Sequence, residues 1–221
     1  MNILVMAGHT LSGVGTGAVS SHINESQENR VFAPLLVKYL KMGGANVTYK
    51  NIDRATTSSY LDEQVRLANN SGKYDLVVQV HFNAGSKDPD SNTTGCEVYA
   101  YDNNGKKYAD RITNKVSSLL RNRGGKINQN LYWLRNTRDL AILIEVCFVD
   151  DKDDARVYKA NKDKLAKLMA EGILNKTIEP PKPPTGQLFA VCVGAYQRST
   201  ADRILAEVKS KGYKDAYLIP R

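Results

Sequence analysis

The sequence predicts an α/β fold, a mostly parallel twisted sheet covered by helices on both faces, plus a small C-terminal βαβ unit. Three apolar runs rich in β-branched residues, typical of interior strands, occur at 2–7, 76–80 and 141–144. Amphipathic segments with helical spacing lie between such runs. Strands that alternate with helices along a chain are typical of a parallel sheet with helices packed on each face.

The elements are expected in the following order. Helices are predicted at 25–41, 58–70, 104–123 and 151–174, and in the C-terminal unit at 200–211. Further strands are predicted at 46–50, 96–101 and 131–134, and in the C-terminal unit at 188–193 and 216–219. The strand at 96–101 alternates as an exposed or edge strand would. Pro34 lies inside the first helix and predicts a kink or a late helix start there.

The domain organisation follows from a proline-rich segment. Residues 179–187 contain four prolines, which make an extended and fairly stiff linker. The linker separates a main domain, 1–178, from a unit at 188–221, which is small to be stable alone.

Composition limits the classes of partner and compartment. The chain has 221 residues and a formal net charge of +8, which suits attraction to an anionic polymer or surface. It carries no recognised nucleic-acid-binding motif and no apolar run long enough to span a membrane. We therefore expect neither a nucleic-acid partner nor insertion into a membrane. Cys96, Cys147 and Cys192 are predicted to be core residues without disulfides. No signal peptide is recognised, which predicts a protein held in the cytoplasm.

A titratable side chain follows each of the three apolar runs. His9 and His81 follow the first two, Glu145 follows 141–144 and precedes further apolar residues, and Glu25 opens a helix. Two histidines and a carboxylate are a common ligand set for catalytic zinc, which would leave Glu145 as a proton carrier. The two histidines and Glu25 also have structural explanations: a histidine at a strand end is more often hydrogen-bonded than bound to a metal, and a glutamate suits a helix N-terminus. Glu145 is harder to explain without a partner, because a carboxylate in an apolar run is unfavourable.

Several short motifs add a resemblance to a known family. They are Gly8-His9, Glu25-x-x-x-Asn29, Val80-His81-Phe82-Asn83-Ala84, Leu134-Arg135-Asn136-Thr137, and Ile142-Leu143-Ile144-Glu145-Val146-Cys147-Phe148 with Asp154. In this order they resemble the zinc-dependent N-acetylmuramoyl-L-alanine amidases, the type 3 amidases of bacterial autolysins and phage endolysins, over residues 2–174. The chain looks most like endolysins of clostridial phages. It departs from the family pattern at Met6-Ala7, Leu140 and Cys147, and none of these is a ligand position.

The resemblance implies a function and a site. It implies hydrolysis of the amide between N-acetylmuramic acid and the L-alanine of the stem peptide in peptidoglycan. It implies one Zn²⁺ per chain on His9, Glu25 and His81, with Glu145 as the catalytic residue. An endolysin would stay in the host cytoplasm until lysis and then act on the cell wall. The alternatives are a zinc peptidase that cuts within the stem peptide and a non-catalytic wall-binding protein.

The C-terminal unit has a resemblance of its own. Residues 189–196, with Ala201, Leu205 and Gly212-Tyr213, resemble one half of a SPOR-type repeat, a module that binds peptidoglycan glycan strands. A complete module has two βαβ halves and this chain has one. A homodimer formed through residues 188–221 is therefore predicted. The alternative is a terminal hairpin packed on the main domain.

Overall fold

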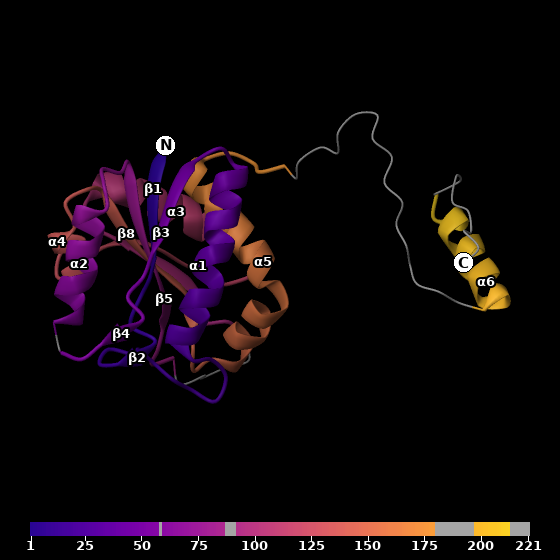
Figure 1. The fold of residues 1–221 in the computed structure, drawn as a ribbon, viewed down its shortest axis with the longest axis horizontal. Coiled ribbons are helices and arrows are strands. Elements are labelled where there is room, and N and C mark those ends of the chain that lie inside the picture. The colour runs from indigo at the N-terminus through magenta and orange to yellow at the C-terminus, as the bar shows by residue number, and fades with distance from the viewer. Residues whose placement is uncertain (58, 87–91, 180–196, 213–221) are drawn as a thin grey trace. The chain divides into compact units, whose positions relative to one another are not determined.

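The computed structural model describes residues 1–57, 59–86, 92–179 and 197–212. The chain divides into two compact units, Met1–Pro181 and Lys182–Arg221, and each is described by itself. Figure 1 shows the ribbon with its helices and strands labelled.

Among the described residues of the first unit, one sheet of six strands confirms the predicted mostly parallel architecture. Its spatial order is β3-β1-β5-β8-β6-β7. The strands are β1 (Asn2–Ala7), β3 (Asn46–Lys50), β5 (Leu76–Asn83), β6 (Cys96–Ala100), β7 (Asn122–Ile127) and β8 (Ala141–Phe148). Neighbours in this sheet pair in parallel, except that β6 is antiparallel to β8. A separate short pair joins β2 (Ser12–Gly13) to β4 (Arg54–Ala55).

Helices cover both faces of the sheet, as predicted, and Figure 1 shows them in two layers. They are α1 (Glu25–Met42), α2 (Tyr60–Asn70), α3 (Asn103–Val116), α4 (Tyr132–Asn136) and α5 (Lys152–Leu174). Side chains of β1 alternate between the two cores: Ile3 and Val5 face the layer that contains α1, α3 and α5, and Leu4 and Met6 face α2 and α4. All four are fully buried, so β1 is an interior strand on both faces.

The first helix begins where the sequence predicted. The Asn24 side chain accepts a hydrogen bond from the backbone N–H of Gln27 and caps the helix, which starts at Glu25. Pro34 lies inside the helix, so of the two predicted alternatives, a kink or a late start, the late start is excluded. The early start matters for the site because it places the Glu25 side chain at the end of α1 nearest the strand ends of β1 and β5.

Three predictions in the second half of the domain are wrong. The predicted strand at 131–134 is instead the short helix α4, since an apolar run this short fits either element. The predicted helix 104–123 ends at Val116, and residues that were assigned to its end begin the strand β7. The strand β6 therefore lies between β8 and β7 and is not an edge strand.

The strand β7 was not predicted, because its sequence has no alternating apolar pattern and contains two glycines. A Cβ atom on Gly125 would lie 2.6 Å from Asp110 Oδ1 and 2.8 Å from the Ala109 Cβ atom of α3. Glycine at this position lets the strand approach the helix closely.

In the second unit, α6 (Arg198–Ser210) confirms the predicted helix 200–211 to within two residues. The predicted strands 188–193 and 216–219, Cys192 and most of the predicted linker lie outside the described residues. Cys96 and Cys147 are free and buried, as predicted. In the described parts of both units, no helix has the length and apolar character needed to cross a membrane.

Candidate metal centre

The three strands that carry the predicted site residues lie side by side. The sheet order places β5 between β1 and β8, and His81 on β5 is directly opposite Glu145 on β8. His9 follows β1 by two residues and Glu25 opens α1. The carboxyl ends of neighbouring parallel strands meet at one edge of the sheet, where ligands gather in α/β folds.

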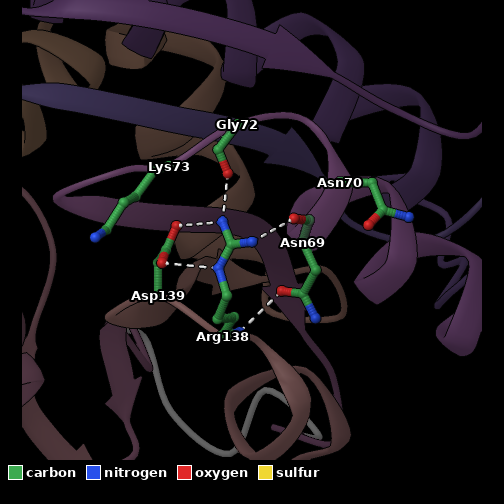
Figure 2. A pocket seen from close by; sticks show the side chains of 6 residues that line it. All are labelled: Asn69, Asn70, Gly72, Lys73, Arg138 and Asp139. Carbon is green, nitrogen blue, oxygen red and sulfur yellow. Dashed lines mark hydrogen bonds and ion pairs between the residues drawn. The ribbon is translucent and has the colours of Figure 1, made fainter.

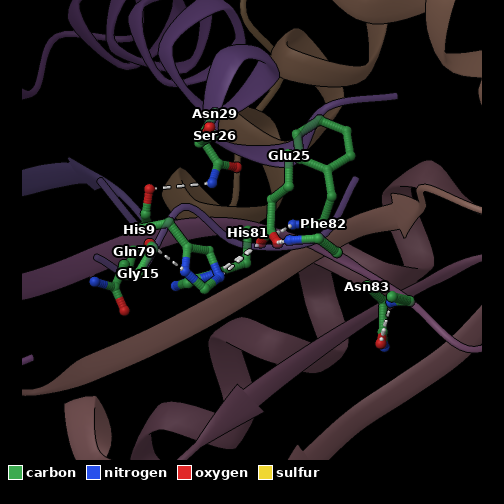
Figure 3. Close-up of polar contacts among 12 residues, drawn as sticks. His9, Gly15, Glu25, Ser26, Asn29, Gln79, His81, Phe82 and Asn83 are labelled. Carbon is green, nitrogen blue, oxygen red and sulfur yellow. Dashed lines mark hydrogen bonds and ion pairs between the residues drawn. The ribbon is translucent and has the colours of Figure 1, made fainter. Parts of the chain in front are cut away.

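Two imidazoles converge on one carboxylate oxygen at this edge (Figure 3). His9 Nε2 lies 3.2 Å and His81 Nδ1 lies 3.0 Å from Glu25 Oε1. The two rings are 4.7 Å apart between centroids. One donor atom from each of the three residues lies within 4.8 Å of the others.

This donor set fits a zinc ion. Tetrahedral zinc with ligand bonds of about 2.0–2.1 Å places neighbouring ligand atoms about 3.3 Å apart. The two measured separations, 3.0 and 3.2 Å, are close to that value. Two histidines and one carboxylate also leave a fourth position for water or substrate.

The electrostatics of the three residues favour the ligating forms. Burial alone would raise the pKa of Glu25, but hydrogen bonds from His81 and His9 outweigh it and hold that pKa well below its usual range. Burial lowers the pKa of His81, although Glu25 opposes the shift. An ionised carboxylate and a neutral imidazole are the forms that bind a metal.

Glycines permit the close approach of these side chains. A Cβ atom on Gly8 would lie 2.4 Å from the His81 ring, and one on Gly17 would lie 2.6 Å from Glu25 Oε2. The glycine-rich loop after β1 therefore wraps the site, and its Ala18 backbone N–H donates to Glu25 Oε2 at 2.8 Å.

His9 has an unusual backbone conformation, with φ at +56°. A histidine in this left-handed region is uncommon and needs support from its surroundings. Its Nδ1 lies 3.0 Å from the carbonyl oxygen of Gly15, and donation by Nδ1–H leaves Nε2 free to bind a metal.

Two side chains hold the carbonyl oxygen of His9. Arg30 Nη2 donates to it at 3.2 Å, and Gln64 Nε2 donates at 3.1 Å. Gln64 is held in turn by Gln79, whose Nε2 donates to Gln64 Oε1 at 3.1 Å. Sequence reasoning missed this clamp, because its members are spread over three elements.

Arg30 is the centre of the clamp. Its guanidinium also donates to the carbonyl oxygens of Ser26 at 2.9 Å and Ile52 at 2.8 Å, and to Asp53 Oδ1 at 2.7 Å. The side chain is only 13% exposed. Its contacts tie the start of α1, the end of β1 and the loop after β3 into one unit around His9.

Glu145 lies beside His81 in the sheet and is not one of the three converging residues. The residue is partly exposed, but its Oε2 atom is buried and has no hydrogen-bond partner in the described part of the chain. Burial, with the negative charges of Glu25 and Glu97, raises the pKa of Glu145 to about 8. The carboxyl group therefore keeps its proton at neutral pH in the absence of a metal.

Asp154, the last residue of the motifs that resemble the family, holds two backbone segments together near Glu145. It is fully buried, and it accepts hydrogen bonds from the backbone N–H groups of Phe148 at 2.8 Å and Gly95 at 3.0 Å. These contacts join the end of β8 to the start of β6 and steady the edge on which Glu145 lies.

A pocket of about 630 Å³ lies at the other ends of the central strands (Figure 2). Arg138 is one of the residues that line it, and its guanidinium donates to the carbonyl oxygens of Asn69, at 2.8 Å, and Gly72. Its Nε and Nη2 atoms also donate to the two carboxylate oxygens of Asp139, at 3.2 and 3.1 Å. These contacts join the end of α2 to the start of β8, so Arg138 has a structural role there.

Comparison with known proteins identifies the family. Residues 3–175 match the family model described as N-acetylmuramoyl-L-alanine amidase. An uncharacterized protein of Clostridium perfringens is 37% identical over 85% of this chain, and the chain spans only 56% of that protein. The N-acetylmuramoyl-L-alanine amidase CwlM of Bacillus licheniformis is 28% identical over 100% of this chain and 85% of its own length.

A solved structure supports the same relationship. The catalytic domain of an endolysin that targets Clostridia difficile superimposes with a TM-score of 0.72 at 34% identity, covering 81% of this chain and 99% of that domain. Residues 3–175, which match the family model, contain His9, Glu25, His81 and Glu145. On the strength of the family match over residues 3–175, this chain belongs to the N-acetylmuramoyl-L-alanine amidase family.

Proposed function

We propose that the chain is a zinc-dependent peptidoglycan amidase that cleaves the bond between N-acetylmuramic acid and the L-alanine of the stem peptide. The observation that carries the proposal is the convergence of two imidazoles and a carboxylate within 4.8 Å, beside Glu145, in a chain of this family. His9, Glu25 and His81 hold one zinc ion in this account. When bound, zinc lowers the pKa of a water molecule and polarises the carbonyl group.

Glu145 carries the proton in the proposed reaction. Its carboxylate form accepts a proton from the attacking water, and its acid form gives that proton to the departing nitrogen of L-alanine. The C–N bond breaks, leaving a carboxylate on the lactyl group and a free amine on the peptide. In the metal-free chain burial raises the pKa of Glu145, and the positive charge of a bound zinc ion would act in the opposite direction.

Mass spectrometry of digested cell walls tests the reaction. The proposal expects released stem peptides with a free N-terminal L-alanine and no new cleavage between amino acids. Cleavage within the peptide would favour the zinc-peptidase alternative. A turbidity assay on purified walls, with and without a chelator, tests the wall-binding alternative, which expects no clearing in either case.

We also propose that the protein is a phage or prophage endolysin, held in the host cytoplasm until lysis. The structural likeness to an endolysin catalytic domain supports this role. Residues 1–178 would form the catalytic domain and 179–187 the linker.

The C-terminal residues 188–221 are proposed to be a SPOR-like module that binds the wall or pairs two chains. Its helix α6 has no fully buried residue in the structure of one chain. Light scattering after size exclusion, at micromolar concentration, is expected to give about twice the chain mass of 24.5 kDa. The Leu205→Asp variant should shift the mass towards that of one chain, because a charge on the apolar side of α6 opposes pairing. A clean monomer for the unmodified chain would remove the dimer proposal.

The clamp on His9 gives a further prediction. Arg30→Gln is expected to weaken zinc binding by roughly 10–100-fold, the effect typical of residues that orient a metal ligand. The reason is that Arg30 supports the left-handed backbone of His9. A zinc titration against a competing chelator measures the affinity, and Arg66→Gln, at an exposed position on α2, is the matched control. Equal affinity in the two variants would show that the clamp does not position His9.

A further inference from the structure

Glu97 lies in a row of titratable side chains across the sheet. It is the antiparallel partner of Glu145, which is in turn the parallel partner of His81. Side chains directly opposite one another in a sheet lie on the same face. Leu143, two residues before Glu145, packs in the core beneath α2 and α4, so the row lies on that face, near the carboxyl end of β8.

Four donors surround the Glu97 carboxylate. Arg123 Nε donates to Oε2 at 2.7 Å, and Lys126 Nζ also donates to Oε2. Asn83 Nδ2 donates to Oε1 at 2.6 Å, and the Tyr99 hydroxyl donates to the same oxygen at 2.8 Å. The Glu97 side chain is only 3% exposed, so its role is to hold its neighbours rather than to meet a ligand.

The two cations of this group exceed its negative charge. In the described part of the chain, Glu97 is the only carboxylate that pairs with Arg123 or Lys126, which leaves one positive charge in excess. The side chain of Arg123 is 31% exposed and that of Lys126 is 39% exposed. Arg123 uses only Nε towards Glu97, so its two terminal nitrogens keep donors for a ligand. Arg123 and Lys126 therefore form a partly exposed cationic surface near Glu145, held in place by Glu97.

The distance suits the second residue of the stem peptide. The strand β7, which carries both cations, lies two strand spacings from Glu145 on β8, about 10 Å. Two residues of extended peptide span at most about 7 Å. The side chains of Arg123 and Lys126 extend from β7 to Glu97 on β6, the strand next to β8, and this brings the two cations closer to Glu145 than the backbone of β7 is. The residue after L-alanine in a stem peptide is D-glutamate linked through its side chain, and its main-chain carboxyl is either free or amidated.

We propose that Arg123 and Lys126, held by Glu97, bind the free carboxylate on the second residue of the stem peptide. The proposal rests on the amidase function above. It makes the enzyme selective for wall material in which this carboxyl is not amidated. Ring contacts also hold both cations, since the Arg123 Cζ atom lies 5.0 Å from the centroid of the Phe148 ring and the Lys126 Nζ atom lies 5.7 Å from the centroid of the Tyr99 ring.

Two matched substrates test the proposal. They are muramoyl tripeptides with L-lysine in the third position, which differ only in a free or amidated carboxyl on the second residue. The unmodified protein should prefer the free carboxyl by about tenfold or more in kcat/KM, as expected for a charged hydrogen bond. Lys126→Gln and Arg123→Gln should each reduce that preference towards one, mainly through KM. Lys73→Gln, an exposed lysine that precedes β5, should retain the preference.

The outcomes separate the two proposals. Cleavage of neither substrate by the unmodified protein would contradict the amidase function. Equal cleavage of both would overturn the carboxylate site and leave the amidase function standing. An equal loss of activity on both substrates in Lys126→Gln, with an unchanged melting temperature, would also overturn it, because a purely structural role affects both substrates alike.

Discussion

Glu145→Gln is expected to reduce peptidoglycan hydrolysis by roughly 10²–10⁴-fold, the usual contribution of a positioned general acid–base. Glutamine has nearly the shape of glutamate but cannot carry the proton. The fold should persist, because glutamine replaces a carboxyl group whose buried oxygen makes no hydrogen bond in the described part of the chain. The zinc content should also persist, because Glu145 is not one of the three converging residues.

A zymogram and a turbidity assay on purified walls measure the effect. Glu179→Gln makes the same chemical change at an exposed position beyond the end of α5 and should retain full activity. Near-normal rates in Glu145→Gln would show that another group carries the proton.

His81→Ala is expected to lose both the metal and the activity. Its imidazole lies 3.0 Å from Glu25 and supplies one of the three donor atoms, so the remaining two residues are too few to hold zinc tightly. Zinc affinity should fall by more than about 100-fold, since even a residue that only orients a ligand contributes roughly 10–100-fold. Isothermal titration with zinc measures the affinity, and the same samples are assayed on walls.

The matched control for His81→Ala is His22→Ala, which removes the one histidine outside the site. It should bind zinc and hydrolyse walls as the unmodified protein does. A thermal melt of His81→Ala in the absence of metal tests its fold. A folded His81→Ala variant with unaltered zinc affinity would rule out His81 as a ligand.

The centre of the fold could be predicted because its strands have strong local patterns. The strands β1, β5 and β8 are apolar and rich in β-branched residues, and the structure places them side by side in the sheet. Two other elements, β7 and α4, were harder to predict. The strand β7 carries two glycines and few apolar residues, and α4 is too short for its spacing to separate helix from strand.

In the candidate site, too, some residues could be predicted from the sequence and others could not. His9, Glu25 and His81 were named from strand ends and from the family resemblance, and the structure brings them together. The contacts that support them could not be predicted, since the hydrogen bonds of Arg30 and Glu97 reach residues 22 and 26 positions away. No local period relates such positions. The left-handed backbone of His9 has no sequence signal beyond the glycine beside it.

Zinc analysis of two glutamate variants tests the central claim most directly. Glu25→Gln and Glu145→Gln make the same chemical change at two carboxylates, of which only Glu25 lies among the converging donors. After dialysis, elemental analysis should find one zinc per chain in the unmodified protein and in Glu145→Gln, and far less in Glu25→Gln. Equal zinc in both variants, or loss of zinc only from Glu145→Gln, would contradict the account.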